Sequence, residues 1–252
     1  MDVVQGVDAL RPSLGPLFVV IGVFDGMHRG HAYLLEHLRV EAGSRGANPT
    51  VITFDHHPDE VLMGRAPALL LDPDERLERL DAAGVAVTVV QHFDKALRET
   101  PYDRFIERIR DRVELRGFLM TPDAAFGFER RGTPTTVAEV GLRDGFDVVV
   151  VPPFTIDGEE VRSSAIRDAI VRGDLTTAAR LLGRPVTITG STGHAAGGRT
   201  PLEFALPIAL PPDGDYPAMV HDDPVTLQIR GGVASLLRDV PAGRVTVELA
   251  GS

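Results

Sequence analysis

The feature that most constrains this chain is an alternation of short, continuous apolar segments with helical patterns across its first 183 residues. Continuous apolar runs are typical of strands that are covered on both faces. Helix-start signals and apolar residues at helical spacing fall between and after these runs. The predicted strands are residues 17–21, 50–54, 85–90, 117–120 and 147–151, and the predicted helices are 29–42, one starting at 72–73, 101–113, 164–172 and 175–182. This order predicts an α/β fold with a doubly wound parallel sheet, of the Rossmann-like type.

The pattern changes at Gly183-Arg184-Pro185, where helical spacing gives way to short β-like segments separated by Gly and Pro. We therefore expect two domains, 1–183 and 184–252, the second a small all-β, barrel-like module. Its predicted strands are residues 186–190, 203–210, 215–220, 224–230 and 243–250.

Composition excludes several classes of function. The net charge of −10 argues against broad nucleic-acid binding, which needs a basic face. With no cysteine, the chain cannot form disulfides or thiolate metal sites. It shows neither a signal-peptide pattern nor an apolar stretch of about 18 residues, so we expect a cytoplasmic protein without a membrane partner. The sequence does not indicate an oligomeric state.

The clearest motif is Gly-Val-Phe-Asp-Gly-Met-His-Arg-Gly-His at residues 22–31, between a predicted strand and a predicted helix. Glycines let the backbone approach a ligand closely, and a helix N-terminus favours phosphate. His28 and His31 flank Gly30 and can present two donors to one anion. The alternative is a glycine-rich turn with incidental histidines. The context of strand and helix favours a phosphate site.

A second anion site is suggested by Ser163, Ser164 and Arg167 at the start of another predicted helix. Two hydroxyl groups and a guanidinium can bind phosphate oxygens from a second side. The alternative is an ordinary helix start with no ligand, because serine often caps helices and arginine often lies on their surface.

Two further segments follow predicted strands, where ligands bind in open α/β sheets. Residues 53–58 contain the adjacent His56 and His57, but no further ligands stand at supporting spacing, so we expect no dedicated metal site. Residues 123–132 contain Phe126 and Phe128, which could face a planar ligand or simply pack the loop.

In this order the four motifs resemble those of the bacterial bifunctional riboflavin kinase/FMN adenylyltransferase family, the prokaryotic FAD synthetases. That family shows Gly-x-Phe-Asp-Gly-x-His-x-Gly-His, Thr-Phe-x-Pro-His-Pro, Gly-x-Asp/Asn-Phe-x-Phe-Gly and Ser-Ser-Thr-x-Ile-Arg, and the resemblance covers residues 17–185. The chain departs from the pattern at Thr121 and Pro122, and it has His56 in place of Pro, Ala124 in place of Phe and Arg162 in place of the first Ser. The ATP elements are therefore better kept than the flavin elements.

The resemblance implies transfer of AMP from ATP to FMN, giving FAD and pyrophosphate, with Mg²⁺ accompanying ATP. It implies that His28 and His31 donate to the α- and β-phosphates, and that Ser163, Ser164 and Arg167 hold the β- and γ-phosphates. The other implied binding residues are Gly22, Phe24, Asp25, Gly26, Gly30, His57, Pro58, Asp123 and Phe126. Two alternatives stay open: a nucleotidylyltransferase with another phosphate acceptor or CTP, and a non-catalytic regulatory homologue that binds flavin or nucleotide.

In the resembling family the C-terminal domain is a β-barrel kinase with a Gly-Arg-x-x-Gly-Phe-Pro-Thr-Ala-Asn stretch, whose Thr and Asn help to bind Mg–ATP. Aligned from Gly198-Arg199 without a gap, this chain has Ala205 and Pro207 at those two positions. Glu248 could be mistaken for the family's catalytic base, but we expect it to be a solvent-facing strand residue. We therefore expect residues 184–252 to be a truncated kinase-like module without kinase activity.

Overall fold

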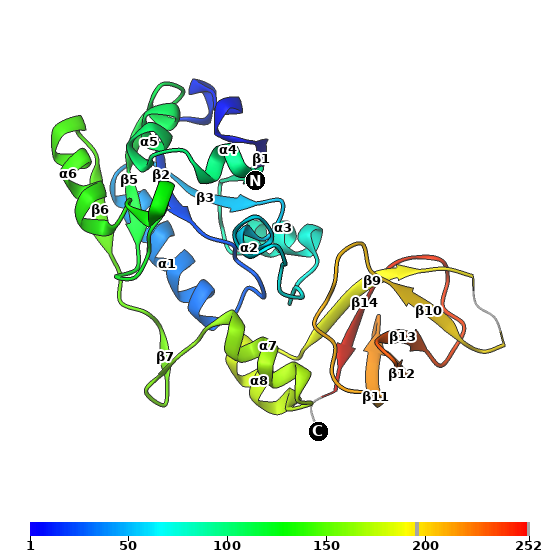
Figure 1. Ribbon diagram of the computed structural model, residues 1–252. Helices are drawn as coiled ribbons and strands as arrows, with labels where there is room; N and C mark the ends of the chain where they lie inside the picture. Colours follow the sequence, from blue (N-terminus) through cyan, green and yellow to red (C-terminus); the bar gives the residue numbers. More distant parts are fainter. Residues whose placement is uncertain (195–196, 251–252) are drawn as a thin grey trace. The chain divides into compact units, whose positions relative to one another are not determined.

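The computed structural model describes residues 1–194 and 197–250, which form two compact units (Figure 1). One unit consists of Met1–Phe24, His31–Ala66 and Leu77–Phe154, and the other of Asp25–Gly30, Pro67–Arg76 and Thr155–Ser252. The second unit thus contains two short segments from the first half of the sequence. The domain boundary at residue 183 stays a prediction.

The first unit is built on a six-stranded parallel sheet in the order β1-β4-β3-β2-β5-β6. The winding direction reverses between β2 and β5, which creates a topological switch point at their carboxyl ends. The five predicted strands are confirmed, and β1, a short edge strand, is an addition. The strands are β1 (Asp2–Gln5), β2 (Leu17–Ile21), β3 (Asn48–Phe54), β4 (Val87–Gln91), β5 (Leu115–Met120) and β6 (Asp147–Val150).

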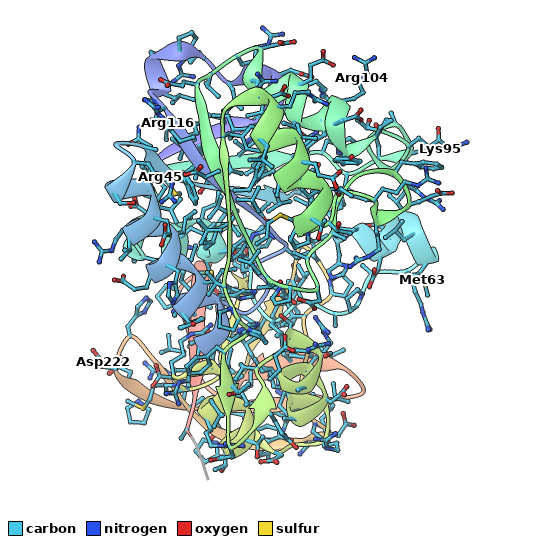
Figure 2. All side chains as sticks on the ribbon, turned by 90° about the vertical axis from the view of Figure 1, so that its left-hand side faces the viewer. Arg45, Met63, Lys95, Arg104, Arg116 and Asp222 are labelled. Atoms are coloured by element: carbon cyan, nitrogen blue, oxygen red, sulfur yellow. The ribbon has the colours of Figure 1, made fainter. Side chains whose placement is uncertain are left out.

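Helices lie on both faces of this sheet, which confirms the doubly wound class. On one face, Val19 and Ile52 of the strands share a core with Ile106 and Val137 of two helices. On the other face lies Phe18, with the guanidinium of Arg45, directly after α1, 5.0 Å from its ring centroid. The helices up to β6 are α1 (Arg29–Ser44), α2 (Pro58–Met63), α3 (Pro73–Ala82), α4 (Lys95–Arg98), α5 (Tyr102–Arg110) and α6 (Pro134–Asp144). Charged side chains such as Lys95 and Arg104 point outward (Figure 2).

The helix α6 was not predicted, although its start carries a clear signal. Thr133 and Thr136 form a reciprocal capping box, and Pro134 occupies the first turn, where its missing N–H costs nothing. The helix ends at Gly145, whose φ of 81° suits glycine.

In the second unit, α7 (Ser163–Val171) and α8 (Leu175–Leu182) are followed by a closed antiparallel barrel in the order β10-β13-β12-β11-β14-β9. The barrel-like module is therefore confirmed. The strands of this unit are β7 (Thr155–Ile156), β8 (Glu159–Glu160), β9 (Thr187–Thr192), β10 (Thr200–Glu203), β11 (Gly214–Val220), β12 (Asp223–Arg230), β13 (Val233–Leu236) and β14 (Gly243–Leu249).

The predicted strand at 203–210 is wrong, because β10 covers Thr200–Glu203 and the following residues leave the ladder. Proline at 207 has no N–H to donate to a ladder. Instead, Pro207 O accepts a hydrogen bond from Leu69 N at 2.7 Å, and Ala209 N donates to Leu69 O at 2.8 Å. Among the described residues, no helix has both the length and the apolar character needed to cross a membrane.

Candidate active site

The switch point of the first unit carries a small cavity of about 50 Å³, lined by the apolar residues Ile21, 118–120 and 124–126. Phe126 forms part of its wall, and the same ring packs against Phe118 at 5.8 Å and Phe105 at 6.0 Å between centroids. The loop-packing interpretation of Phe126 is therefore confirmed, and its contact with a planar ligand stays a prediction. Phe128 is 40% exposed, and Asp123 accepts a hydrogen bond from the Thr121 hydroxyl at 2.8 Å.

The loop between β2 and α1 has an unusual backbone. Phe24, Gly26 and Met27 have φ angles of 54°, 86° and 41°, in the left-handed region. For a non-glycine residue this conformation costs about 1–3 kcal/mol and is concentrated at ligand-binding sites. Phe24 is buried, and its ring lies 5.0 Å from that of His31 in the first turn of α1. Loops of this kind form anion-binding concavities from successive backbone N–H groups.

Two glycines of the loop allow close packing inside the second unit. A Cβ at Gly26 would lie 2.9 Å from Leu70 Cδ1, and the φ of 86° would strain any other residue. A Cβ at Gly30 would lie 3.1 Å from the His28 ring and 3.2 Å from Val161 O. The His28 imidazole is therefore held against the first turn of α1 by the absence of a side chain at Gly30.

His28 is only 5% exposed, and its surroundings keep it neutral. Burial, followed by the positive charge of Arg184, lowers the pKa of His28 to about 4. A neutral imidazole still offers one N–H donor and one acceptor. Arg184 also donates to Gly26 O at 2.9 Å, so it supports the loop directly. Sequence reasoning used Arg184 only as a boundary marker and missed this role.

Asp25 connects the loop to the second predicted anion motif. Its carboxylate accepts hydrogen bonds from Leu70 N at 2.8 Å and from the Arg167 guanidinium at 2.9 Å, while its backbone O accepts one from the Ser163 hydroxyl at 2.8 Å. Arg167 also donates through Nε to Ala68 O at 2.6 Å. The geometry thus brings Asp25, Ser163 and Arg167 together, and much of their polar capacity is used on the protein itself.

The remaining predicted residues have simpler surroundings. Ser164 is exposed in the first turn of α7. His57 caps α2, with its Nδ1 accepting from Asp59 N at 3.2 Å, and Pro58 is the first residue of that helix. Of all the predicted site residues, the second unit contains Asp25, Gly26, His28, Gly30, Ser163, Ser164 and Arg167, and the first contains Gly22, Phe24, His31, His57, Pro58, Asp123 and Phe126.

We expect Asp25→Ala to lower the free energy of unfolding by about 3–5 kcal/mol, because it leaves the largely buried Arg167 guanidinium without its carboxylate. Urea unfolding followed by circular dichroism measures the loss. Arg180→Ala is the matched control, since Arg180 pairs with Asp157 on the surface, where such pairs contribute about 0–1 kcal/mol. Equal losses in the two variants would contradict a structural role for the buried pair.

The lowered pKa of His28 makes stability depend on pH. In the unfolded chain the His28 imidazole is protonated near pH 6.5, whereas in the folded chain it is protonated only near pH 4. The neutral His28 therefore contributes fully to the free energy of unfolding above pH 6.5, and this contribution is lost as the pH falls towards 4. The full effect is about 3 kcal/mol. We expect wild type to lose more unfolding free energy than His28→Gln between pH 7.5 and 4.5. Parallel pH curves for the two proteins would show that His28 is not held neutral.

Comparison with known proteins agrees with these observations. The family described as FAD synthetase matches residues 11–165. A bifunctional riboflavin kinase/FMN adenylyltransferase of Haemophilus influenzae is 33% identical over 196 residues, covering 77% of this chain and 64% of that protein. The protein of the same name from Escherichia coli (strain K12) is 30% identical over 198 residues, covering 77% of this chain and 63% of that protein. The chain thus spans less than two thirds of the length of these relatives.

A solved structure from Streptococcus pneumoniae, described as a macrolide-efflux protein, has a TM-score of 0.81 and 22% sequence identity, covering 99% of this chain and 98% of that one. This similarity supports the fold alone. The family match covers more than half of the chain and includes the loop at residues 22–31 and the start of α7. The chain belongs to the FAD synthetase family.

Proposed function

We propose that this chain is an FMN adenylyltransferase, which transfers AMP from ATP to FMN and releases pyrophosphate. The observation that carries the proposal is the loop of residues 22–31, with its left-handed backbone, its buried neutral His28 and its direct entry into α1, in a member of the FAD synthetase family. These features fit a site that receives a phosphate chain without a basic protein surface.

In the proposed reaction a phosphate oxygen of FMN attacks the α-phosphorus of ATP. A new P–O bond forms while the bond to the pyrophosphate oxygen breaks, so no covalent step on the protein is needed. Catalysis then rests on positioning and on donors aimed at the developing charge. The loop N–H groups, His28 and His31 would supply these donors, and the Arg184 charge beside His28 would favour the anionic phosphates.

We assign different roles to two residues of α7, Arg167 and Ser164. The bonds from Arg167 to Asp25 and Ala68 support a positioning role, in which Arg167 fixes the loop. The exposed hydroxyl of Ser164, in the first turn of α7, is better suited to contact the leaving phosphates. Since Asp25 already accepts from Leu70 and Arg167, it is poorly suited as a metal ligand. Mg²⁺ would instead be held by phosphate oxygens and water, where it neutralises charge.

The cavity at the switch point bears on the size of the acceptor. The cavity beside Ile21, Met120 and Phe126 has a volume of about 50 Å³, which is far smaller than a typical ligand pocket of roughly 300–1,000 Å³. If the flavin ring binds at this cavity, the loop after β5 would have to move outward. The small cavity favours one second candidate, nucleotidyl transfer to a smaller phosphate acceptor.

The direct test incubates the purified protein with FMN, Mg²⁺ and each of the four nucleoside triphosphates, and separates the products by chromatography. We expect FAD and pyrophosphate from ATP alone. Transfer from CTP, or transfer only to a smaller phosphate compound, would replace the proposed substrates. Binding of FMN and ATP with no product from any pair would instead indicate a regulatory homologue.

We expect His28→Ala and His31→Ala each to lower the transfer rate by roughly 10²-fold or more, the scale of removing one transition-state donor. His37→Ala is the matched control, because His37 lies further along the same helix α1. Thermal unfolding of each variant is measured together with its transfer rate, because His28 is buried and its replacement affects packing. Near wild-type rates in folded variants would remove both histidines from the mechanism.

We also infer that the barrel does not phosphorylate riboflavin. Ala205 and Pro207 lie after β10 and have no side-chain group that can bind a metal or donate a hydrogen bond. Glu248 is exposed on β14, which confirms the expected solvent-facing position. With riboflavin, ATP and Mg²⁺ we expect no FMN above a blank without enzyme. FMN formation proportional to enzyme concentration would refute the inference.

A further inference from the structure

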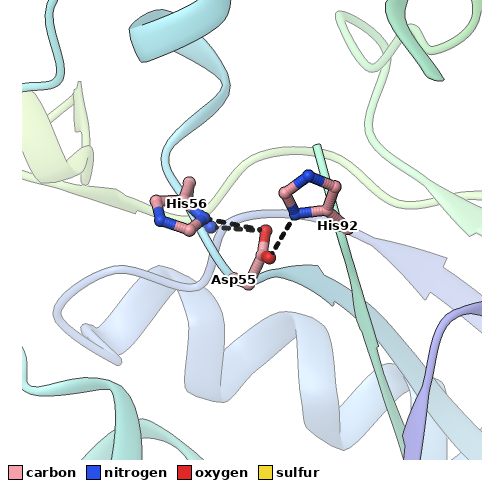
Figure 3. A group of neighbouring side chains, drawn as sticks. All are labelled: Asp55, His56 and His92. Carbon is pink, nitrogen blue, oxygen red and sulfur yellow. Dashed lines mark hydrogen bonds and ion pairs between the residues drawn. The ribbon is translucent and has the colours of Figure 1, made fainter. Parts of the chain in front are cut away.

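Three polar side chains gather at the carboxyl ends of β3 and β4 in the first unit: Asp55, His56 and His92 (Figure 3). The two strands pair in parallel up to Phe54 and Gln91, so Asp55 and His92 are the first residues beyond the paired ends. Asp55 N donates to Gln91 O at 3.2 Å, and Phe93 N donates to an Asp55 carboxylate oxygen at 3.2 Å. The sheet edge therefore fixes the backbone that carries two of the three side chains.

The possible ligand atoms already converge. Asp55 Oδ2 lies 2.6 Å from His92 Nδ1, and Asp55 Oδ1 lies 3.3 Å from His56 Nδ1. One ligand atom from each residue lies within 4.8 Å of the others. Ligands at about 2.1 Å from a tetrahedral ion are about 3.4 Å apart, so small side-chain rotations would suffice. His56 is 46% and His92 is 64% exposed, which leaves room for water to complete a coordination shell.

We propose that Asp55, His56 and His92 bind a divalent transition-metal ion such as Zn²⁺, with water as the remaining ligand. Two imidazoles and one carboxylate suit zinc and its neighbours, whereas Mg²⁺ prefers an all-oxygen shell. The site is separate from any Mg²⁺ that accompanies ATP, and it does not depend on the proposed transfer reaction.

Sequence spacing alone predicted no dedicated metal site here, because His92 lies 37 positions from Asp55 in the chain. The FAD synthetase motif that residues 53–58 resemble has Pro at the position of His56, so the second imidazole is a departure of this chain from that motif. The adjacent His57 is engaged differently, as the cap of α2. The reaction proposed above uses none of Asp55, His56 and His92.

Without metal, His92 and Asp55 form a hydrogen-bonded pair, and each changes the pKa of the other. The hydrogen bond to Asp55, with help from the nearby charge of Asp94, raises the pKa of His92. Burial works to raise the pKa of Asp55, but hydrogen bonds from His92, Phe93 N and His56 outweigh it and lower that pKa. Metal binding requires imidazoles without a proton on the binding nitrogen, so the affinity of such a site falls as the pH falls.

The test is calorimetric titration of the chelator-treated full chain with Zn²⁺, without nucleotide or flavin, at pH 7.5 and 6.0. We expect one Zn²⁺ per chain, weaker binding at pH 6.0, and retention of the ion in millimolar Mg²⁺. His56→Ala and His92→Ala should each weaken binding by at least about 10-fold, since losing even a supporting residue of a metal site costs 10–100-fold. His194→Ala, an exposed histidine elsewhere, should bind as wild type does.

Circular dichroism checks that the variants fold, which we expect because both histidines are exposed. Asp55→Asn provides a second variant that keeps an oxygen acceptor for Phe93 N but loses the charge. Co²⁺ adds a spectroscopic measurement, because its visible absorption reports coordination by protein ligands and should disappear in the His92 variant. Wild-type affinity in the folded His56, His92 and Asp55 variants, or no Zn²⁺ binding by wild type, overturns the proposal.

Discussion

The ion pair between Asp25 and Arg167 is the interaction on which the candidate site depends. It joins a residue of the first loop to one 142 positions later, with the carboxylate 3% and the guanidinium 17% exposed. Burying two charges is costly unless other hydrogen bonds accompany the pair. Here Leu70 N donates to the carboxylate and Arg167 Nε donates to Ala68 O. The same pair therefore fixes three segments of the second unit that are far apart in sequence.

The segment around Leu69 extends this network to the barrel. Leu69 N donates to Pro207 O, and Leu69 O accepts from Ala209 N. The neighbouring Ala68 O accepts from Arg167, and Leu70 N donates to the Asp25 carboxylate. A few residues later, the buried Glu75 accepts from the Thr189 hydroxyl of β9 at 2.6 Å. Through these contacts the barrel supports the backbone at residues 68–70, which in turn binds Asp25 and Arg167.

The sequence predicted what is encoded locally and missed what is encoded between distant segments. The central strands were found because both of their faces are buried, which produces uninterrupted apolar runs such as residues 17–21. The segment after β10 was misassigned because its apolar residues pair with Leu69, a partner that no local pattern reveals. The loop at residues 22–31 was recognised from one compact motif, and its role in phosphate binding stays a prediction. Arg184 and His92 were missed because each acts on a residue far away in the chain.

His28 and His92 show how the surroundings decide what a histidine can do. His28 is enclosed beside Gly30 and near the fixed charge of Arg184, so protonation is opposed from two sides and the ring remains a neutral donor. His92 is exposed beside the carboxylate of Asp55, which favours its protonated form. A neutral, buried imidazole suits contact with an anionic substrate without adding charge to the free protein. An exposed imidazole that shares a carboxylate with a second histidine suits exchange of a proton for a metal ion.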